Sequence, residues 1–416
     1  MELKKVVVTG IGTISPVGLT AKETWENVKN GISGCDLITH YDTSNFKTKF
    51  ACEVKNYDSS NYFDRKEVKR IDRFTQFALI ASDEAIKDSG INLELVDRAR
   101  AGVIWASGIG GVETFYQEIK DYVEGGFIPR FSPFFIPKII SDIAAGQMSI
   151  KHGLMGPNYC TVSACASSTN AIIDSFNIIR LGMADYMVTG GSEASINDIG
   201  MGGFQSMMAL STNNEEYKSA SRPFCATRDG FVMGEGGSAL ILEEYEHAKA
   251  RGAKIYAEVV GAGMSADAYH LTAPHPDGLG ASNVMKNAIR DAGIKPSDLD
   301  YINVHGTATP LGDIAELKAI KAVFGDSAYD INISSTKSIV GHLLGAAGAM
   351  EATFCIFAIV DGIVPPTINH HQIDENIDPK LNLTLHKAQK RDIKYALSNT
   401  FGFGGHNSSV IFKKAE

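Results

Sequence analysis

Short runs of β-branched and other apolar residues alternate along the chain with longer segments in which apolar residues recur at helical spacing. The runs at 6–12 (VVVTGIG), 101–108 (AGVIWASG) and 184–191 (ADYMVTGG) predict buried strands that end in glycine turns. The segment 73–90 (RFTQFALIASDEAIKDSG) predicts an amphipathic helix with Gly90 as its C-cap. This alternation predicts an α/β protein, and its 41 glycines favour many turns at one edge of a sheet.

Two distant segments show a similar strand pattern. KKVVVTGIGTIS at 4–15 and KIYAEVVGAGMS at 254–265 each combine a strand with a Gly-x-Gly sequence. Two copies so far apart indicate a duplicated layered domain, and 416 residues exceed what one core usually holds. We therefore predict an N-terminal half, residues 1–250, and a C-terminal half, residues 251–416, that pack tightly without a linker.

The sequence Gly10-Ile11-Gly12 resembles the start of a dinucleotide-binding fingerprint. Ser15 occupies the third glycine position, Pro16 follows it, and no suitable acidic residue stands about 20 positions further on. We therefore interpret the segment as a turn that leads from a strand into a loop.

Composition and charge narrow the classes of function. Hydrophobic residues make up 44% of the chain and charged residues 21%, an ordinary globular balance, and the net charge is −9. The chain has no Lys/Arg-rich block that would bind nucleic acid, and no window approaches the 18 uninterrupted apolar residues that would indicate a membrane span. The start, MELKKVVVTG, lacks signal-peptide features, and the six cysteines lack CxxC spacing. We expect a cytoplasmic protein without a disulfide framework or a zinc site.

Cys165 lies in the stretch YCTVSACASSTN (159–170), among small side chains and just before a predicted helix that ends at Gly182. Unpaired N–H groups and the helix macrodipole favour an anion at such a helix start. We therefore expect a lowered thiol pKa and thiolate at neutral pH, with backbone amides placed to receive an oxyanion. The other five cysteines are interpreted as small buried apolar residues.

Candidate partners for this thiol lie in the other half of the chain. His305 ends a short apolar strand in NVHGTATPLGD (303–313), and Lys337 and His342 precede a small-residue helix in SSTKSIVGHLLGAAGAMEATF (334–354). Two imidazoles can hold a thioester carbonyl and stabilise an enolate, and a nearby cation supports the negative charge. A Cys-His-Asn hydrolase would need only one histidine. The histidines lack the spacing of metal ligands, so no metal is predicted.

These motifs resemble those of the β-ketoacyl-acyl-carrier-protein synthases, specifically the type II elongating condensing enzymes. The matching stretches are SACASS around Cys165, SRPFCATRDGFVMGEG (221–236), HGTATPLGD around His305, TKSIVGHLLGAAG around His342 and TFGFGGHN (400–407). The resemblance covers essentially the whole chain. It implies a thiolase-like fold, duplicated in a five-layer α-β-α-β-α architecture, and a homodimer.

The resemblance also implies roles for the candidate residues. Cys165 is similar to the nucleophile that accepts the acyl chain, and His305 and His342 are similar to the pair that drives decarboxylation of malonyl-carrier protein. Lys337 is similar to their electrostatic support. Phe401 is similar to the residue whose amide completes the oxyanion hole with that of Cys165 and whose ring gates the thiol.

Further positions resemble those that hold the substrate. Thr307 and Thr309 are similar to the hydroxyls that bind the phosphopantetheine amides, and Thr272 lies at its phosphate end. The positions similar to the acyl pocket are Ile109, Phe204 and Phe135, the last reaching in from the other subunit. The implied reaction needs no enzyme-bound cofactor, because the substrates are carried on the phosphopantetheine of acyl-carrier protein.

A local cluster of positive charge lies in RKEVKR (65–70), where Lys66, Lys69 and Arg70 stand together in an acidic protein. A solvated helix face is the plain alternative. The resemblance favours a docking site for acyl-carrier protein, which is acidic.

Three positions depart from the family's pattern. Cys225 replaces a common Asp or Asn, Ala308 replaces a Ser or Gly between the two threonines, and Met208 stands where some members have a carrier-binding arginine. The last departure predicts a weaker docking edge.

The implied activity is a decarboxylative Claisen condensation in fatty-acid elongation. An acyl group on Cys165 joins malonyl-carrier protein to give β-ketoacyl-carrier protein, CO2 and free carrier protein. A degradative thiolase would need a second catalytic cysteine, but GFGGHN (402–407) occupies that place. Initiating and chalcone-type enzymes use Cys-His-Asn, which His342 argues against, and a chain-length factor would lack the nucleophile. A stand-alone polyketide ketosynthase would share all four catalytic residues and stays open as the alternative. These residues are Cys165, His305, Lys337 and His342.

Overall fold

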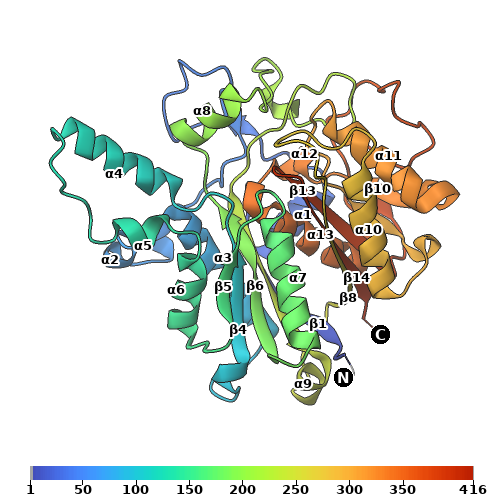
Figure 1. Ribbon diagram of the computed structural model, residues 1–416, viewed down its shortest axis with the longest axis horizontal. Helices are drawn as coiled ribbons and strands as arrows, with labels where there is room; N and C mark the ends of the chain where they lie inside the picture. The colour runs from blue at the N-terminus through green and yellow to red at the C-terminus, as the bar shows by residue number, and fades with distance from the viewer. Residues whose placement is uncertain (1–2, 416) are drawn as a thin grey trace.

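The computed structural model describes residues 3–415, which are built around one ten-stranded sheet (Figure 1). The strands follow one another across it in the order β10-β9-β13-β14-β8-β1-β7-β6-β4-β5. Their bounds are β1 (Val6–Ile14), β4 (Ala101–Ala106), β5 (Asn158–Thr161), β6 (Tyr186–Glu193), β7 (Gly236–Glu244), β8 (Ala257–Ala266), β9 (Tyr301–Asn303), β10 (Asn332–Ser334), β13 (Tyr395–Gly402) and β14 (His406–Lys414). Two small sheets pair β2 (Asp36–Leu37) with β3 (Phe50–Ala51) and β11 (Ile363–Val364) with β12 (Gln389–Lys390).

Helices connect and cover these strands. The α-helices are α1 (Ala21–Lys29), α2 (Arg65–Val68), α3 (Arg73–Ser89), α4 (Val112–Glu124), α5 (Phe135–Ile139), α6 (Ile143–His152), α7 (Ser167–Arg180), α8 (Asp198–Ser206), α9 (Tyr245–Ala250), α10 (Leu279–Ala292), α11 (Gly312–Phe324), α12 (Lys337–Val340) and α13 (Ala347–Asp361). Short 3-10 turns lie at Ser59–Asn61, Arg98–Arg100, Tyr217–Ser219, Pro296–Asp298, Gly325–Tyr329 and Leu344–Ala346.

The sheet consists of two runs of five strands that share one topology. β5-β4-β6-β7-β1 forms the first run and β10-β9-β13-β14-β8 the second. The first strands of the two runs, β1 and β8, meet in antiparallel pairing with Val6 opposite Val259. The similar stretches at 4–15 and 254–265 therefore occupy equivalent places in the two runs. The predicted boundary at residue 250 falls at the end of α9 and stays a prediction.

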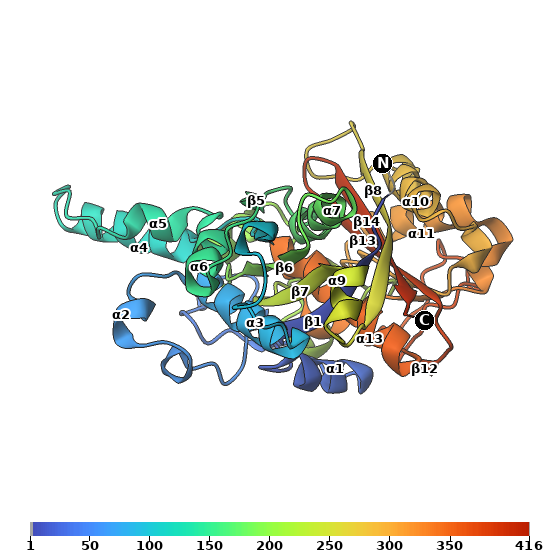
Figure 2. The ribbon, with the colours of Figure 1, turned by 90° about the horizontal axis from the view of Figure 1, so that it is seen from below.

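Helices cover the outer faces of the two runs and also pack between them (Figures 1 and 2). The helix α3 packs against β1, β6 and β7, and α10 packs against β8 and β14. Between the runs, α7 and α13 pack against each other and against strands of both runs. The layers therefore follow the order α3, first run, α7 with α13, second run, α10. This order confirms the predicted α/β class and its thiolase-like layering.

The helix predicted at 73–90 is confirmed as α3. Asp72 caps its first turn by accepting a hydrogen bond from the N–H of Phe74, and Gly90 ends it in the left-handed region with φ of 63°. Side-chain caps and left-handed glycines act within one helical turn, which explains why the sequence located both ends.

The interpretation of Gly10 and Gly12 as a strand-to-loop turn is wrong, because both lie inside β1. A Cβ at Gly10 would lie 2.2 Å from the carbonyl oxygen of Ala85, and one at Gly12 would lie 2.0 Å from that of Ala81. Both carbonyls belong to α3. These glycines therefore let a helix backbone approach the strand directly.

The segment Leu344–Asp361, most of which is α13, is long and apolar enough to cross a membrane, yet 83% of it is buried inside the protein. A helix that is apolar on all sides is expected where other elements surround it. This segment is therefore a core helix between the two runs of strands.

Candidate active site

A tight turn before α7 presents Cys165 to the interior. Ala164 adopts a φ of 50°, which is uncommon for a residue other than glycine and is tolerated because its side chain is small. The N–H of Ser167 donates to the carbonyl oxygen of Ala164 at 3.2 Å, and α7 begins at Ser167. Cys165 is 8% exposed. The expected position of this thiol just before a helix is confirmed.

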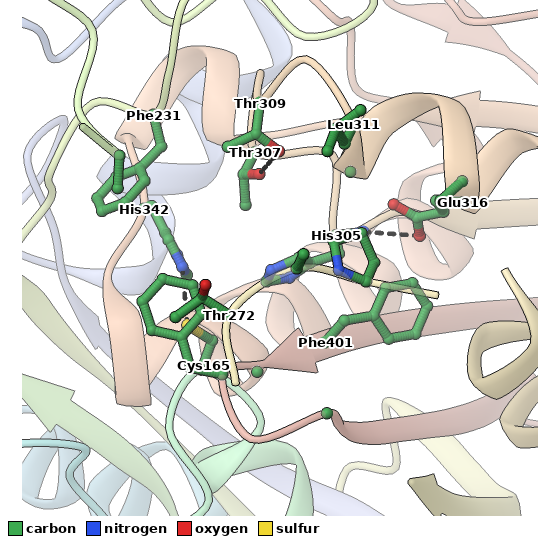
Figure 3. A pocket seen from close by; sticks show the side chains of 18 of the residues that line it. Cys165, Phe231, Thr272, His305, Thr307, Thr309, Leu311, Glu316, His342 and Phe401 are labelled. Carbon is green, nitrogen blue, oxygen red and sulfur yellow. Dashed lines mark hydrogen bonds between the residues drawn. The ribbon is translucent and has the colours of Figure 1, made fainter. Parts of the chain in front are cut away.

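Two histidines from the C-terminal half of the chain, in the segments after β9 and α12, approach the thiol (Figure 3). The Nε2 atom of His342 lies 3.1 Å from the Sγ atom of Cys165, and the ring centres of His305 and His342 are 5.3 Å apart. The backbone holds both rings in place. The N–H of His305 donates to Glu316 at 2.9 Å, and the N–H of His342 donates to the carbonyl oxygen of Val232 at 2.8 Å.

Burial controls the protonation of this cluster. It raises the pKa of the Cys165 thiol to about 12, against the opposing effects of the Lys337 ammonium and the Phe403 N–H. The expectation of a thiolate at neutral pH is therefore wrong, because desolvation outweighs the helix start. Burial and the Lys337 charge hold the pKa values of His305 and His342 well below the usual value. At neutral pH the resting cluster is a thiol beside two neutral imidazoles.

Lys337 acts on the cluster from a buried position. It begins α12 and is 1% exposed, and its Nζ donates to a carboxylate oxygen of Glu351. Burial raises the pKa of Glu351 to about 7, although the Lys337 ammonium opposes this. The ammonium is a positive charge that disfavours protonation of the nearby imidazoles.

A cavity of about 470 Å³ leads to the thiol. The predicted residues that line it are Cys165, Phe204, Thr272, His305, Thr307, Thr309, His342 and Phe401. The hydroxyl oxygens of Thr307 and Thr309 are 3.1 Å apart, and the ring centre of Phe401 lies 5.7 Å from that of His305. The volume is in the range that holds a small ligand.

Two predicted acyl-pocket residues do not line this cavity. Ile109 is 39% exposed, and Phe135 begins α5, where its ring stacks on those of Phe115 and Phe131. The helices α4 and α5 form an arm that projects from the body of the molecule (Figure 2). Within the single chain, Phe135 therefore belongs to this arm.

The predicted docking cluster lies on and beside α2, a one-turn helix whose N-terminus is closed by a capping box between Asp64 and Glu67. Lys66, Lys69 and Arg70 are all exposed. None of the three lines the cavity.

Several side chains that hold the cluster were not predicted. The ring of Phe231 meets that of His342 edge-on, with 5.2 Å between centres. Glu316 accepts the backbone N–H groups of His305 and Gly306, each at 2.9 Å. Phe231 lies inside the matching stretch 221–236, whereas Glu316 lies outside every matching stretch, and nothing in the sequence near either residue marks what its side chain contacts.

The three residues that depart from the family's pattern, Cys225, Ala308 and Met208, have different surroundings. Ala308 adopts a φ of 66°, so a glycine there would be less strained, and its N–H donates to Asp313 at 3.1 Å. Met208 is 86% exposed beside the cavity. The Sγ of buried Cys225 accepts the N–H of His371 at 3.4 Å.

The same cluster is also the group of residues that could hold a metal ion. The Sγ of Cys165 and one ring nitrogen of each of His305 and His342 lie within 4.8 Å of one another. These are three of the four ligands that zinc usually takes. The sequence spacing could not show this, since the fold and not a local motif brings them together. The absence of a metal stays a prediction.

Family models and curated relatives match this chain over nearly its whole length. The family model described as beta-ketoacyl synthase, N-terminal domain, matches residues 3–248, and the C-terminal domain of the same family matches residues 256–371. The 3-oxoacyl-[acyl-carrier-protein] synthase 2 of Staphylococcus aureus strain COL is 49% identical over 413 residues, which cover 99% of each chain. That of Vibrio harveyi is 46% identical over 416 residues, which cover 100% of this chain and 99% of the other.

Solved structures agree with these relatives. A ketosynthase of a type II polyketide synthase, in complex with its acyl-carrier protein and bound to the hexaketide, is 34% identical with a TM-score of 0.92. A beta-ketoacyl synthase from Burkholderia phymatum STM815 is also 34% identical, with a TM-score of 0.91. Each comparison covers 99% of this chain and 100% of the other. The chain therefore belongs to the β-ketoacyl synthase family.

Proposed function

We propose that this protein is an elongating β-ketoacyl-acyl-carrier-protein synthase that condenses an acyl group on Cys165 with malonyl-acyl-carrier protein. The observation that carries the proposal is the convergence of one thiol and two neutral imidazoles on one cavity, with Cys165 Sγ 3.1 Å from His342 Nε2. The 49% identity with a 3-oxoacyl-[acyl-carrier-protein] synthase 2, against 34% with a polyketide ketosynthase, supports fatty-acid elongation.

In the first half-reaction the sulfur of Cys165 attacks the thioester carbonyl of acyl-carrier protein. The thiol proton passes to the neutral Nε2 of His342 and then to the departing phosphopantetheine thiolate. The backbone N–H groups of Cys165 and Phe403 stabilise the oxyanion, because the Phe403 N–H, rather than that of the predicted Phe401, hydrogen-bonds to the Cys165 sulfur. The products are an acyl thioester on Cys165 and the free thiol of carrier protein.

In the second half-reaction malonyl-carrier protein loses CO2, and the electrons of the broken bond form an enolate. One ring N–H of each of His305 and His342 donates a hydrogen bond to the enolate oxygen. His342 does so through Nε2, so its neutral ring carries the proton on Nε2 in this half-reaction and on Nδ1 in the first. The carbanion carbon then attacks the acyl carbonyl, the bond to sulfur breaks, and the released thiolate of Cys165 takes up one proton from solvent. Burial, together with the Lys337 charge, holds the pKa values of both imidazoles low, so that each ring is neutral and can donate one N–H without carrying a charge.

Product analysis tests this proposal directly. The protein is incubated with malonyl-carrier protein and a series of acyl-carrier proteins, and the products are identified by mass. The parent should form both a covalent acyl adduct and a product longer by two carbons, and Cys165→Ala should form neither. An adduct that persists on Cys165→Ala would refute the nucleophile, and products of repeated condensation without reduction would favour a polyketide ketosynthase.

We propose acyl-carrier protein as the partner, docked at Lys66, Lys69 and Arg70. The exposure of these three cations in a chain of net charge −9 supports this site. Thr307 and Thr309 would hold the phosphopantetheine amides and Thr272 its phosphate end.

We propose that the enzyme binds no cofactor of its own. We also propose a cytoplasmic location, which the six free cysteines support.

We propose that the protein forms a homodimer through the edge of the sheet at β5. β5 is the last strand of the sheet, and Tyr159 and Val162 beside that edge are 39% and 61% exposed. The arm carries further exposed apolar residues, Phe127 at 63% and Ile136 at 59%. An unpaired apolar edge favours pairing with a second copy, which would bring Phe135 to the partner's acyl pocket. Sedimentation velocity should give the mass of a dimer, and a monomer at micromolar concentration would contradict this assembly.

A further inference from the structure

Glu193 is a fully buried carboxylate that the condensation chemistry does not use. It ends β6, and its side chain is 0% exposed. Burial raises its pKa to about 7, and the hydrogen bonds that the carboxylate accepts oppose this rise. A buried carboxylate costs free energy unless hydrogen bonds satisfy it, so its partners indicate its role.

Four hydrogen bonds converge on this carboxylate. The Ser107 hydroxyl and the Ile109 N–H donate to Oε1 at 3.0 and 3.3 Å. The N–H groups of Gly108 and Gly345 donate to Oε2 at 2.8 and 3.0 Å. Three of these donors belong to the loop after β4, and the fourth belongs to the turn after His342.

The loop and the turn touch each other at this point. A Cβ on Gly345 would lie 2.2 Å from the amide nitrogen of Gly108, so no side chain fits between the two segments. The turn is also strained, because Leu344 adopts a φ of 48°. Leu344 lines the cavity that contains His342. A single carboxylate therefore joins the segment that carries Ile109 to the segment that carries His342.

We propose that Glu193 is a positioning residue that locks the loop at Ile109 to the turn at His342, so that acyl-chain selection and decarboxylation depend on one carboxylate. The inference rests on the proposed function, because it uses the role proposed for His342 and the acyl-pocket position predicted for Ile109. A carboxylate only accepts hydrogen bonds, and its two oxygens can accept all four donors. The amide of a glutamine has nearly the same shape but would direct an NH2 group at two of these donors. Glu193→Gln therefore keeps the volume and loses the lock.

The test compares Glu193→Gln with Ser107→Ala, which keeps the carboxylate but removes one donor to it and the acceptor of the Gly110 N–H in the same loop. Glu94→Gln is the matched control, since it makes the same chemical change at an exposed position. CO2 release is measured against malonyl-carrier protein concentration, and acylation of Cys165 is measured by mass for carriers of different chain length. Melting curves identify a temperature at which each variant is folded.

We expect Glu193→Gln to lower kcat for CO2 release roughly tenfold or more, because unsatisfied buried donors are costly. The KM for malonyl-carrier protein should not change, since the docking surface is untouched. The ratio of long-chain to short-chain acylation should shift in the same variant. Ser107→Ala should move both quantities in the same direction by a smaller factor, and Glu94→Gln should match the parent.

Parental kcat and a parental chain-length ratio in folded Glu193→Gln would overturn the inference. An equal loss of acylation for every chain length, with no change in the ratio of long-chain to short-chain acylation, would also overturn the inference. Such a result would mean that Glu193 has only a structural role. If Glu193→Gln does not fold, the Ser107→Ala variant provides the test. A parental kcat and a parental chain-length ratio in Ser107→Ala would then refute the inference. A parent protein that neither releases CO2 nor accepts acyl groups would refute the proposed function as well, which separates the two failures.

Discussion

Replacement of His342 by alanine should separate decarboxylation from folding. The His342 side chain is 3% exposed, and its Nε2 lies 3.1 Å from the Cys165 sulfur. Its Nδ1 has no hydrogen-bond partner among residues 3–415. The truncation therefore removes one donor to the enolate without breaking a side-chain hydrogen bond that supports the fold. Loss of one such donor typically costs about 3–4 kcal/mol in the transition state, so CO2 release should fall about 100- to 1,000-fold.

His370→Ala is the matched control, because His370 is 8% exposed but does not line the cavity. Each variant should lose about 0.5–3 kcal/mol in its free energy of unfolding, as buried truncations usually do. The assay is CO2 release from saturating malonyl-carrier protein, well below both melting temperatures. Acylation of Cys165 should fall less than CO2 release, because water can take up the thiol proton. Parental CO2 release by His342→Ala, or an equal loss in His370→Ala, would refute the role given to His342.

Three further perturbations test the acyl pocket, the docking surface and the thiol. Ile109→Phe should shorten the longest acyl chain that labels the protein, since overpacking costs about 1–3 kcal/mol. An unchanged chain-length profile would place the acyl tunnel elsewhere. Reversal of Lys66, Lys69 and Arg70 to Glu should raise the KM for acyl-carrier protein more than about tenfold, because each exposed pair contributes about 0.2–1 kcal/mol and reversal adds repulsion. Turnover of a small acyl-pantetheine thioester should hardly change, and equal loss of both activities would mean that the cluster supports the fold. Alkylation of Cys165 by iodoacetamide should keep rising with pH through pH 9, because only the thiolate reacts and burial raises the thiol pKa to about 12. A rate that levels off below pH 8 would contradict the burial argument.

Local features of the chain were sufficient to locate its elements. The helix α3 was predicted because apolar spacing and the cap at Gly90 act over one or two turns. The strands at 101–108 and 184–191 were predicted from β-branched runs, and they are β4 and β6. The glycine turn predicted at the end of the second run is wrong, because Gly190 and Gly191 lie inside β6. The duplication was visible because two equivalent strands, β1 and β8, must meet the same packing demands.

The candidate site was predictable as a set of residue types and not as a geometry. Cys165, His305 and His342 could be singled out because small residues and glycine turns surround each of them in the sequence. Their mutual positions could not be predicted, because 177 positions separate Cys165 from His342. The partner of Lys337 was missed for a related reason, since α12 and α13 must pack together before Glu351 can pair with it.

The sequence by itself determined the family, several of the strands and helices, and the residue types that the chemistry needs. Only the tertiary structure decided the protonation of those residues, because desolvation depends on every segment packed around a group and here overrides the local helix start at Cys165. It also decided that Gly10 and Gly12 admit a helix rather than a turn, since the constraint comes from α3. The position of Ile109 beside a carboxylate from β6 is of the same kind. Periodicity and caps act between neighbours in sequence, whereas burial, charge and close approach act between neighbours in space.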